Sequence, residues 1–405
     1  MRVVPALLFL SVASMPAADI ALTGATVYSA PDAPPIAGAV IVVHDGKITS
    51  VGPRASVRIP PDAQVIDCSG KFITAGFWNS HVHIFTPALL HARESSAAQL
   101  NGELDAMLNR WGFTTVFDIA SILDNTLALR KRIDSGEARG PRILTVGEPL
   151  QTMVPLYVRD FLAANHLDMP PVKTVDEAVA RVKSLAERGA DGIKLFTGSF
   201  QGATVDNMPT AMVRAAADEA HKHHLPVFAH PQNTAGLESA IDGGVDILAH
   251  TAPGSPAWTP EFVARLKNAH MALIPTLTLW DFEARKAAIP DADREGWMSA
   301  MVAQLRAYSQ AGGEILFGTD VGYTDRFDTS MEYTLMSRAG MTFPQILASL
   351  TTAPARRFGS TSHSGRVALG MDGDLVVLNG DPAKDITALA KVHFTIRAGS
   401  IIYKP

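Results

Sequence analysis

The chain has 405 residues, of which 47% are hydrophobic and 19% charged, so it can bury a large core and is not disordered, collagen-like or a coiled coil. Lysine and arginine number 35 against 40 aspartates and glutamates, and a net charge of -5 excludes the basic surface expected of a protein that binds nucleic acid or an anionic membrane. Its one cysteine, Cys68, excludes an intramolecular disulfide and a cysteine-type zinc site. We therefore expect a small-molecule partner, leave homo-oligomer formation open, and assign any metal to His, Asp, Glu or Lys ligands.

The first 18 residues have the three-part pattern of a secretory signal peptide. Arg2 precedes an apolar run over residues 3–12, and the small residues Ala13 and Ser14 follow it. This run is too short for a permanent membrane helix, and no later segment has the roughly 18 uninterrupted apolar residues that such a helix needs. The sequence predicts removal of residues 1–18 and export of the mature protein, to the periplasm or outside the cell. A buried first strand is the alternative interpretation of the same run.

Residues 19–71 and 363–405 both consist of short β-rich runs separated by turn residues. In the first segment, Asp45-Gly46 lies between the runs 39–43 and 47–51, which is a strong hairpin signal. In the second, the runs 374–378 and 392–396 have the same character. The two segments together predict one small β-sandwich domain formed by both chain ends.

Residues 72–362 alternate apolar strands with helical patterns, which is typical of βα units around a parallel sheet. Thr174 to Glu177 reads as a capping box, and Thr259-Pro260 as a second helix start. The apolar runs expected to be strands lie near 74–82, 114–119, 142–147, 192–196, 226–230, 246–250, 272–278 and 315–319. Eight strands that alternate with helices predict an α/β fold of the (β/α)8 TIM barrel type.

The expected strand ends carry residues of one kind of chemistry. Active sites of such barrels form at the carboxyl ends of the strands. His81 and His83 end the first strand, and since side chains alternate along a strand, both point to the same face. The other strand ends bring the remaining candidates to the same place: Lys194, His230, His250 and Asp320. Four imidazoles, one amine and one carboxylate are thus expected at the mouth of the barrel.

Each of these residues alone would be weak support, because a histidine at a strand end is often structural. The other nine histidines fall in expected helices, turns or the β domain, where we expect them to be solvated. Among them, His221, His223 and His224 resemble a metal site by composition. They close a polar helix, however, where histidine suits the helix dipole, and we expect them on the surface.

The sequence resembles the amidohydrolase superfamily of metal-dependent hydrolases, in the imidazolonepropionase-like group that contains Xaa-Pro dipeptidases. The resemblance covers nearly the whole mature chain. It rests on seven segments in the family's order: residues 76–83, 112–118, 189–195, the strands that end at His230 and His250, 318–320, 351–356 and 373–378.

By this resemblance, His81 and His83 bind the more buried of two divalent metal ions, and His230 and His250 bind the more exposed one. Lys194 is carboxylated by carbon dioxide and bridges both ions, while Asp320 is both a ligand of the buried ion and the residue that moves protons. A hydroxide bridging the metals attacks the substrate carbonyl, and Asp320 passes a proton to the leaving group. Nitrogen and oxygen ligands favour Zn²⁺, although iron, manganese and cobalt are chemically tolerable.

The residue type at position 194 supports this role independently. A lysine buried in a barrel is costly when charged, so its pKa falls and the neutral amine can add carbon dioxide. The alternative is a structural lysine paired with a carboxylate such as Asp320.

The substrate is the least determined feature. Residues 147–151 and 196–199 depart from the segments that dipeptidase-like relatives show, which puts prolidase activity in doubt. Three aromatic residues expected in loops after the strands, Trp258, Trp280 and Tyr323, are compatible with an apolar pocket. We expect a hydrolase of a C–N bond in an amide, dipeptide or cyclic amide. A lactonase or other esterase on the same centre and a non-catalytic exported binding protein are the alternatives.

Overall fold

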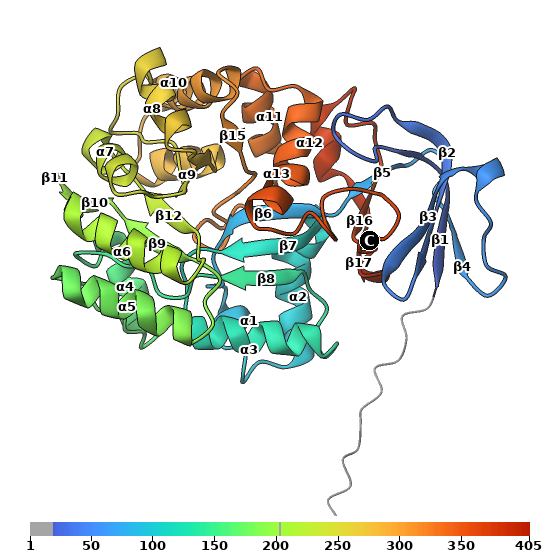
Figure 1. Ribbon diagram of the computed structural model, residues 1–405, viewed down its shortest axis with the longest axis horizontal. Coiled ribbons are helices and arrows are strands. Elements are labelled where there is room, and N and C mark those ends of the chain that lie inside the picture. The colour runs from blue at the N-terminus through green and yellow to red at the C-terminus, as the bar shows by residue number, and fades with distance from the viewer. Residues whose placement is uncertain (1–18, 202–203) are drawn as a thin grey trace, which may run out of the picture.

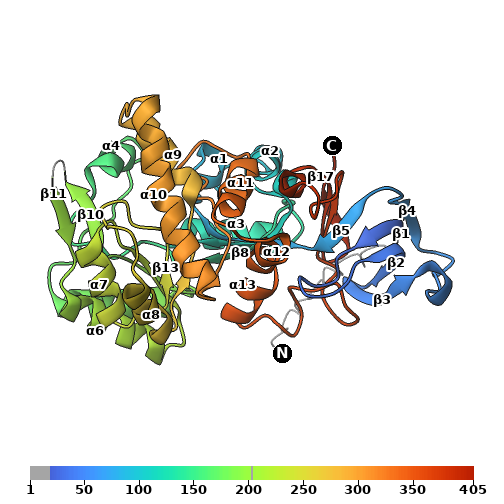
Figure 2. The same ribbon diagram turned by 90° about the horizontal axis from the view of Figure 1, so that it is seen from above.

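The computed structural model describes residues 19–201 and 204–405. The signal peptide predicted for residues 1–18 lies outside the described residues. The molecule has a barrel and, at one end of it, a sheet in which strands from the two ends of the chain lie side by side (Figures 1 and 2). Within these described ranges, no helix combines the length and apolar character needed to cross a bilayer.

Eight parallel strands form the barrel, as the sequence predicts: β6 (Phe77–Val82), β7 (Phe113–Asp118), β8 (Arg142–Thr145), β9 (Ile193–Phe196), β12 (Val227–His230), β13 (Ile247–Leu248), β14 (Ala272–Leu273) and β15 (Glu314–Ile315). Strands β6 to β8 form one hydrogen-bonded group, and the other five form a second. Two parallel bridges join the groups, between Leu150 and Leu195 and between Val82 and Val321. These bridges close the (β/α)8 barrel.

Helices follow every barrel strand and cover the outside of the barrel (Figure 1). In chain order they are α1 (Pro87–Leu90), α2 (Ala97–Met107), α3 (Leu123–Asp134), α4 (Leu156–Ala164), α5 (Val175–Glu187), α6 (Thr210–Lys222), α7 (Thr234–Asp242), α8 (Pro260–Asn268), α9 (Leu277–Lys286), α10 (Asp291–Gln310), α11 (Ser330–Arg338), α12 (Phe343–Leu350) and α13 (Thr352–Arg357). Short 3-10 turns are η1 (Arg54–Ser56), η2 (Asn109–Trp111) and η3 (Ile386–Ala390). Thr174 and Thr259 cap α5 and α8, which confirms both predicted helix starts.

Several observed strands are shorter than the predicted runs, and two of these runs contain a break or a helix start. The run 74–82 divides at Gly76, where β5 (Phe72–Ala75) ends and β6 begins. A side chain at Gly76 would meet Thr114 Oγ1 at 2.1 Å, so only glycine lets the chain pass this close to β7. The run 272–278 stops being a strand at Leu273, and Thr276 turns the chain into helix α9 with a φ of 42°.

The terminal strands form one continuous sheet with the order β18-β17-β16-β5-β1-β2-β3, in which β4 also pairs with β1. Its members are β1 (Ile20–Val27), β2 (Ile36–His44), β3 (Lys47–Pro53), β4 (Gln64–Asp67), β5, β16 (Leu375–Leu378), β17 (Val392–Arg397) and β18 (Ser400–Tyr403). Strand β5, just after the expected domain boundary at residue 71, pairs with β1 and β16 in this sheet. Apolar side chains of both chain ends, such as Ile41 and Val377, share one core. The two ends of the chain therefore build one β domain, and its strands belong to a single sheet.

The barrel interior is filled below its carboxyl end. Phe117 and Phe228 meet at 4.9 Å between ring centroids, and Phe358 lies 5.0 Å from Phe117. Ile247 and Leu316 complete the same buried cluster. This packing gives the carboxyl ends of the strands a rigid apolar floor, on which polar side chains are held in place.

Candidate metal centre

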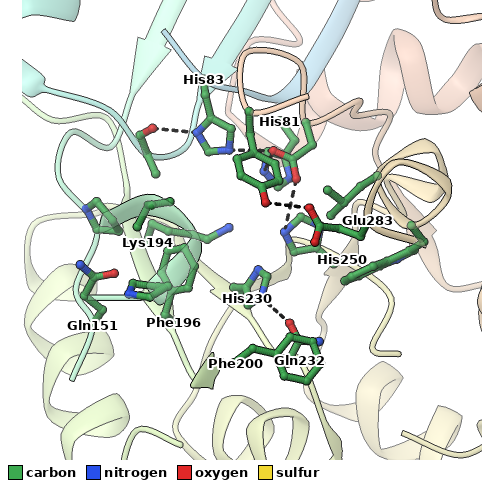
Figure 3. Close-up of a pocket in the computed structure, with 18 of the residues that line it drawn as sticks. His81, His83, Gln151, Lys194, Phe196, Phe200, His230, Gln232, His250 and Glu283 are labelled. Carbon is green, nitrogen blue, oxygen red and sulfur yellow. Dashed lines mark hydrogen bonds and ion pairs between the residues drawn. The ribbon is translucent and has the colours of Figure 1, made fainter. Parts of the chain in front are cut away.

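The structure brings all six predicted residues to one cavity of about 500 Å³ at the carboxyl end of the barrel (Figure 3). The ring centroids of His81 and His83 lie 5.2 Å apart, those of His81 and His250 4.6 Å, and those of His230 and His250 4.7 Å. Asp320 Oδ1 lies 2.8 Å from His83 Nε2 and 3.4 Å from His81 Nε2. Lys194, at the second position of β9, is buried in the wall of this cavity.

Each histidine uses one ring nitrogen on a neighbour and leaves the other available. His81 Nδ1 donates to the carbonyl of Ala249 at 3.0 Å, and His83 Nδ1 donates to that of Ala120 at 2.7 Å. Because a carbonyl can only accept, Nδ1 of both rings carries a proton, and Nε2 is the nitrogen left to contact a metal ion. Such contacts to the outer ring nitrogen orient the histidines of metal sites.

The other two histidines contact side chains. His250 Nδ1 lies 2.7 Å from Thr276 Oγ1, and His230 Nε2 donates to Gln232 Oε1 at 2.9 Å (Figure 3). His230 therefore uses Nε2 for its protein contact, whereas His81 and His83 use Nδ1. The nitrogen of His230 that remains for a ligand is Nδ1. The four histidines thus offer three Nε2 atoms and one Nδ1 atom to a ligand.

The residues present fit a metal ion. In the described part of the chain, His81 Nε2 and Asp320 Oδ1 are buried and make no hydrogen bond, which is costly unless another group satisfies them. One ligand atom each from His81, His83 and Asp320 lies within 4.8 Å of the others. Imidazole nitrogens and a carboxylate oxygen are ligands that divalent transition metals accept.

Burial disfavours the charged forms of three histidines of the site and of Lys194. It lowers the pKa of His81 to about 4 and that of His230 to about 3, and it places the pKa of His250 well below its ordinary value. Burial also lowers the pKa of Lys194 to about 7, although the charge of Asp320 acts in the opposite direction. Near neutral pH His81, His230 and His250 are therefore in the form that binds metal, and a large fraction of Lys194 is the free amine.

Three residues at this end of the barrel have left-handed backbone conformations without being glycine. They are Gln232 with a φ of 47°, Thr276 with 42° and Asp320 with 60°. This conformation is rare for a β-branched residue such as Thr276, and strain of this kind gathers at functional sites. Two of the three orient a histidine of the site, and the third is a candidate ligand itself.

Gln232 is expected to control metal affinity through His230. Replacing it in Gln232→Ala removes the acceptor that fixes the ring, and loss of such a contact lowers metal affinity by about 10- to 100-fold. Titration of the purified protein with zinc in competition with a chromophoric chelator measures this change. Gln151→Ala is the matched control, because Gln151 is a buried glutamine of the same cavity whose side chain donates to the carbonyl of Met169. Equal zinc affinities in the two variants would contradict a role of Gln232 in orienting His230.

Helix α9 depends on a buried carboxylate from another helix. Its N-terminus has no side-chain cap, and Glu332 of α11 accepts hydrogen bonds from the backbone of Leu277 at 2.9 Å and of Thr278 at 2.7 Å. Glu332 also accepts from Thr278 Oγ1 at 2.8 Å and is fully buried. Glu332 thus holds the start of α9, which Thr276 directly precedes. Since Thr276 Oγ1 contacts His250, Glu332 also helps to position that histidine.

We expect Glu332→Ala to lower the free energy of unfolding by about 2–4 kcal/mol, because it leaves buried donors unsatisfied. Burial raises the pKa of Glu332 from 4.5 to about 7, so the folded chain binds this proton more tightly than the unfolded chain. This term makes stability fall as pH rises from about 4.5 to about 7 and level off above. Glu332→Gln cannot titrate, so the stability advantage of the unmodified protein over it should shrink as pH rises from about 4.5 to about 7 in urea unfolding. If the difference in free energy of unfolding between the unmodified protein and Glu332→Gln grew with pH, this would contradict the raised pKa of Glu332.

The sequence did not predict most of the cavity wall. Trp280 and Tyr323 line the cavity as expected of an apolar pocket, but Trp280 lies in helix α9 and not in a loop, and Trp258 lies elsewhere. The role of Gln232 was also missed, because this residue lies beyond the end of β12 and has a left-handed backbone conformation that the sequence pattern does not show. His221, His223 and His224 are exposed, and the other six histidines outside the site are not buried either, as predicted.

The chain is similar to known proteins over most of its length. The model of the amidohydrolase family matches residues 72–402. An adenine deaminase from Rubrobacter xylanophilus is 24% identical in an alignment 404 residues long that covers 95% of this chain, and a dihydroorotase from Anaeromyxobacter dehalogenans is 23% identical over 85% of this chain and 86% of its own. A crystal structure of a Bifidobacterium longum protein, provisionally described as a prolidase, has a TM-score of 0.81 at 27% identity and covers 96% of this chain and 95% of that one.

A family model that spans most of the chain, together with this fold, establishes the family. The chain belongs to the amidohydrolase family. It spans 57% of the length of the adenine deaminase that it matches.

Proposed function

We propose that the protein is a metal-dependent hydrolase that cleaves a carbon–nitrogen bond of amide type in a small molecule. The observation that carries the proposal is the convergence of four histidines, Lys194 and Asp320 on one cavity, with two unsatisfied buried ligand atoms among them. A non-catalytic binding protein would not need this set of groups. The relatives named as adenine deaminase, dihydroorotase and prolidase all act on carbon–nitrogen bonds, which supports the same class of reaction.

In this proposal His81, His83 and Asp320 hold one divalent cation, and His230 and His250 hold a second. When bound there, the cations would supply Lewis acidity toward the substrate carbonyl and would lower the pKa of a water molecule. Asp320 accepts the proton of that water on a carboxylate oxygen and delivers it to the leaving nitrogen. The buried cavity wall excludes bulk water and thereby strengthens these electrostatic effects.

Lys194 is proposed to be carboxylated and to bridge the two cations. No carboxylate lies within 4.0 Å of Lys194 Nζ in residues 19–201 and 204–405, so a structural ion pair gains no support from the described contacts. Its lowered pKa supplies the neutral amine that adds carbon dioxide. The carbamate then carries a negative charge and two oxygen donors.

We further propose Zn²⁺ as the metal, because the ligands are nitrogen and oxygen without a thiolate. Export from the cytoplasm is proposed on the pattern of residues 1–18 alone. A lactone or other ester would undergo the same attack, so esters belong in any test of the activity.

The test is an activity screen of zinc-loaded protein prepared with bicarbonate. The panel contains aryl and alkyl amides, Xaa-Pro dipeptides, cyclic amides, ureas and lactones, and each is measured with and without removal of metal by a chelator. We expect metal-dependent hydrolysis of members with a C–N bond. Turnover confined to lactones would replace the proposal with an esterase, and no metal-dependent turnover of any member would overturn it.

A further inference from the structure

The cavity above the metal ligands is almost entirely apolar. Apart from the six ligand candidates, its wall consists of aromatic and aliphatic side chains with only four polar exceptions: Gln151, Gln232, Glu283 and Tyr323. Among the side chains that the structure describes, no arginine and no lysine other than Lys194 lines it. A cavity of about 500 Å³ accommodates a ligand of drug-like size, and its wall decides which chemistry is admitted.

Aromatic rings lie directly against the histidines of the site. Phe85 stacks on His83 with an interplanar angle of 8° at 5.7 Å between centroids, and Phe196 stacks on His230 at 4.8 Å. Trp280 meets His250 edge-on at 5.6 Å. The groups on either side of a bond positioned over the ligands therefore contact apolar surface and not solvent.

The apolar wall continues to the rim of the cavity. Phe200, in the hairpin of β10 (Gly198–Gln201) and β11 (Thr204–Asn207), lines the cavity while 42% of its surface is exposed. An exposed phenylalanine at the mouth of an apolar cavity is a feature of ligand-binding surfaces. Its position suits contact with the outer part of a substrate.

The charges near the cavity do not favour an anionic substrate. Glu283 is a carboxylate in the wall, and it accepts a hydrogen bond from Tyr323 Oη at 2.7 Å (Figure 3). The cation beside it, Lys286, donates to the same Tyr323 oxygen at 3.0 Å and lies 3.8 Å from Glu283. Lys286 thus compensates Glu283, and a free carboxylate in the cavity would meet no cation outside the metal site. A buried charge without a partner is strongly unfavourable.

We propose that the substrate is a neutral, largely apolar amide, carbamate or urea with aryl or alkyl groups on both sides of the scissile bond, and that substrates with a free carboxylate, such as dipeptides, are rejected. This inference rests on the proposed hydrolase function and names the substrate class of that site. The bond cleaved joins the carbonyl carbon to nitrogen, water supplies the new oxygen, and the amine leaves with one proton from that water.

The test compares substrates in pairs that differ only by a carboxylate: N-benzoylpyrrolidine with N-benzoylproline, and an N-acylaniline with the matching N-acyl-4-aminobenzoate. We expect kcat/KM to favour the neutral member of each pair by at least about 100-fold, as follows from an unpaired carboxylate in an apolar site. Calorimetric titration of Asp320→Asn with both members gives the same comparison without turnover. We expect only the neutral members to bind.

Two variants of the rim residue make the test specific to charge. Phe200→Lys adds a cation at a half-exposed position, so it should reduce the ratio of kcat/KM between the neutral and the carboxylate member of a pair. Phe200→Leu keeps the position apolar and should leave this ratio unchanged. Preference for the carboxylate members would overturn the inference while leaving the hydrolase function intact. Binding of neither or both members to Asp320→Asn would also overturn it. Neutral members that bind but are turned over by no form of the protein would instead count against the proposed function.

Discussion

Lys194→Ala is expected to lose metal and activity together. The variant lacks the oxygens that join the two cations, so we expect the second metal to dissociate and kcat to fall by at least about 10³-fold, as removal of metal-ion assistance worth several kcal/mol implies. Short-chain carboxylic acids should partly restore both properties, because they can supply bridging oxygens in the space that the side chain leaves. Metal content by elemental analysis and kcat, measured with and without added acetate or propionate, test this expectation.

Lys194→Arg separates the carbamate from a simple positive charge. A guanidinium cannot form the carbamate, so this variant should fail as Lys194→Ala does, and acids should not rescue it because its side chain still fills the space. A second metal retained in Lys194→Ala without added acid would contradict the bridging role.

Asp320→Asn is expected to lower kcat by about 10²–10⁴-fold, which is the typical contribution of general acid–base catalysis. The amide of asparagine keeps one oxygen donor near His81 and His83 but cannot accept a proton at neutral pH. We therefore expect the variant to retain most of its metal. Steady-state kinetics and elemental analysis on the same preparation separate the two roles of the residue.

The leaving group provides the control for this prediction. Substrates whose leaving amine is weakly basic, such as a nitroaniline, need less protonation and should lose less rate in Asp320→Asn than substrates with an alkylamine. The acidic limb of the pH–rate profile should also shift or vanish in the variant. A near-normal kcat on an alkylamide would show that the proton is moved by another group.

The fold was predictable because strand ends, caps and the alternation of β and α patterns are local features. The sequence pattern did not predict the strand boundaries that depend on tertiary contacts. Nothing local separates β5 from β6, since the break at Gly76 comes from the close approach of Thr114. The end of the seventh strand was missed for a similar reason, because Glu332, distant in sequence, caps the helix that begins at Leu277.

The candidate ligands were predictable because parallel strands bring their ends together, so six separate positions in the sequence become one site. The residues that orient them were harder to predict. Thr276 and Gln232 act through side-chain hydrogen bonds that depend on left-handed backbone conformations. Most of the apolar wall, apart from Trp280 and Tyr323, was missed because it is assembled from several segments distant in sequence, including α4, α9, α10 and the hairpin that carries Phe200.

The metal content of the purified protein tests the central claim most directly. Protein reconstituted with zinc and bicarbonate and then freed of unbound metal should contain close to two equivalents of zinc per chain by elemental analysis, since five candidate side chains and the Lys194 carbamate provide for two ions. The double variant His81→Ala, His83→Ala should lose the inner ion. A content of two equivalents supports the binuclear hydrolase, and no more than trace zinc after reconstitution would contradict it.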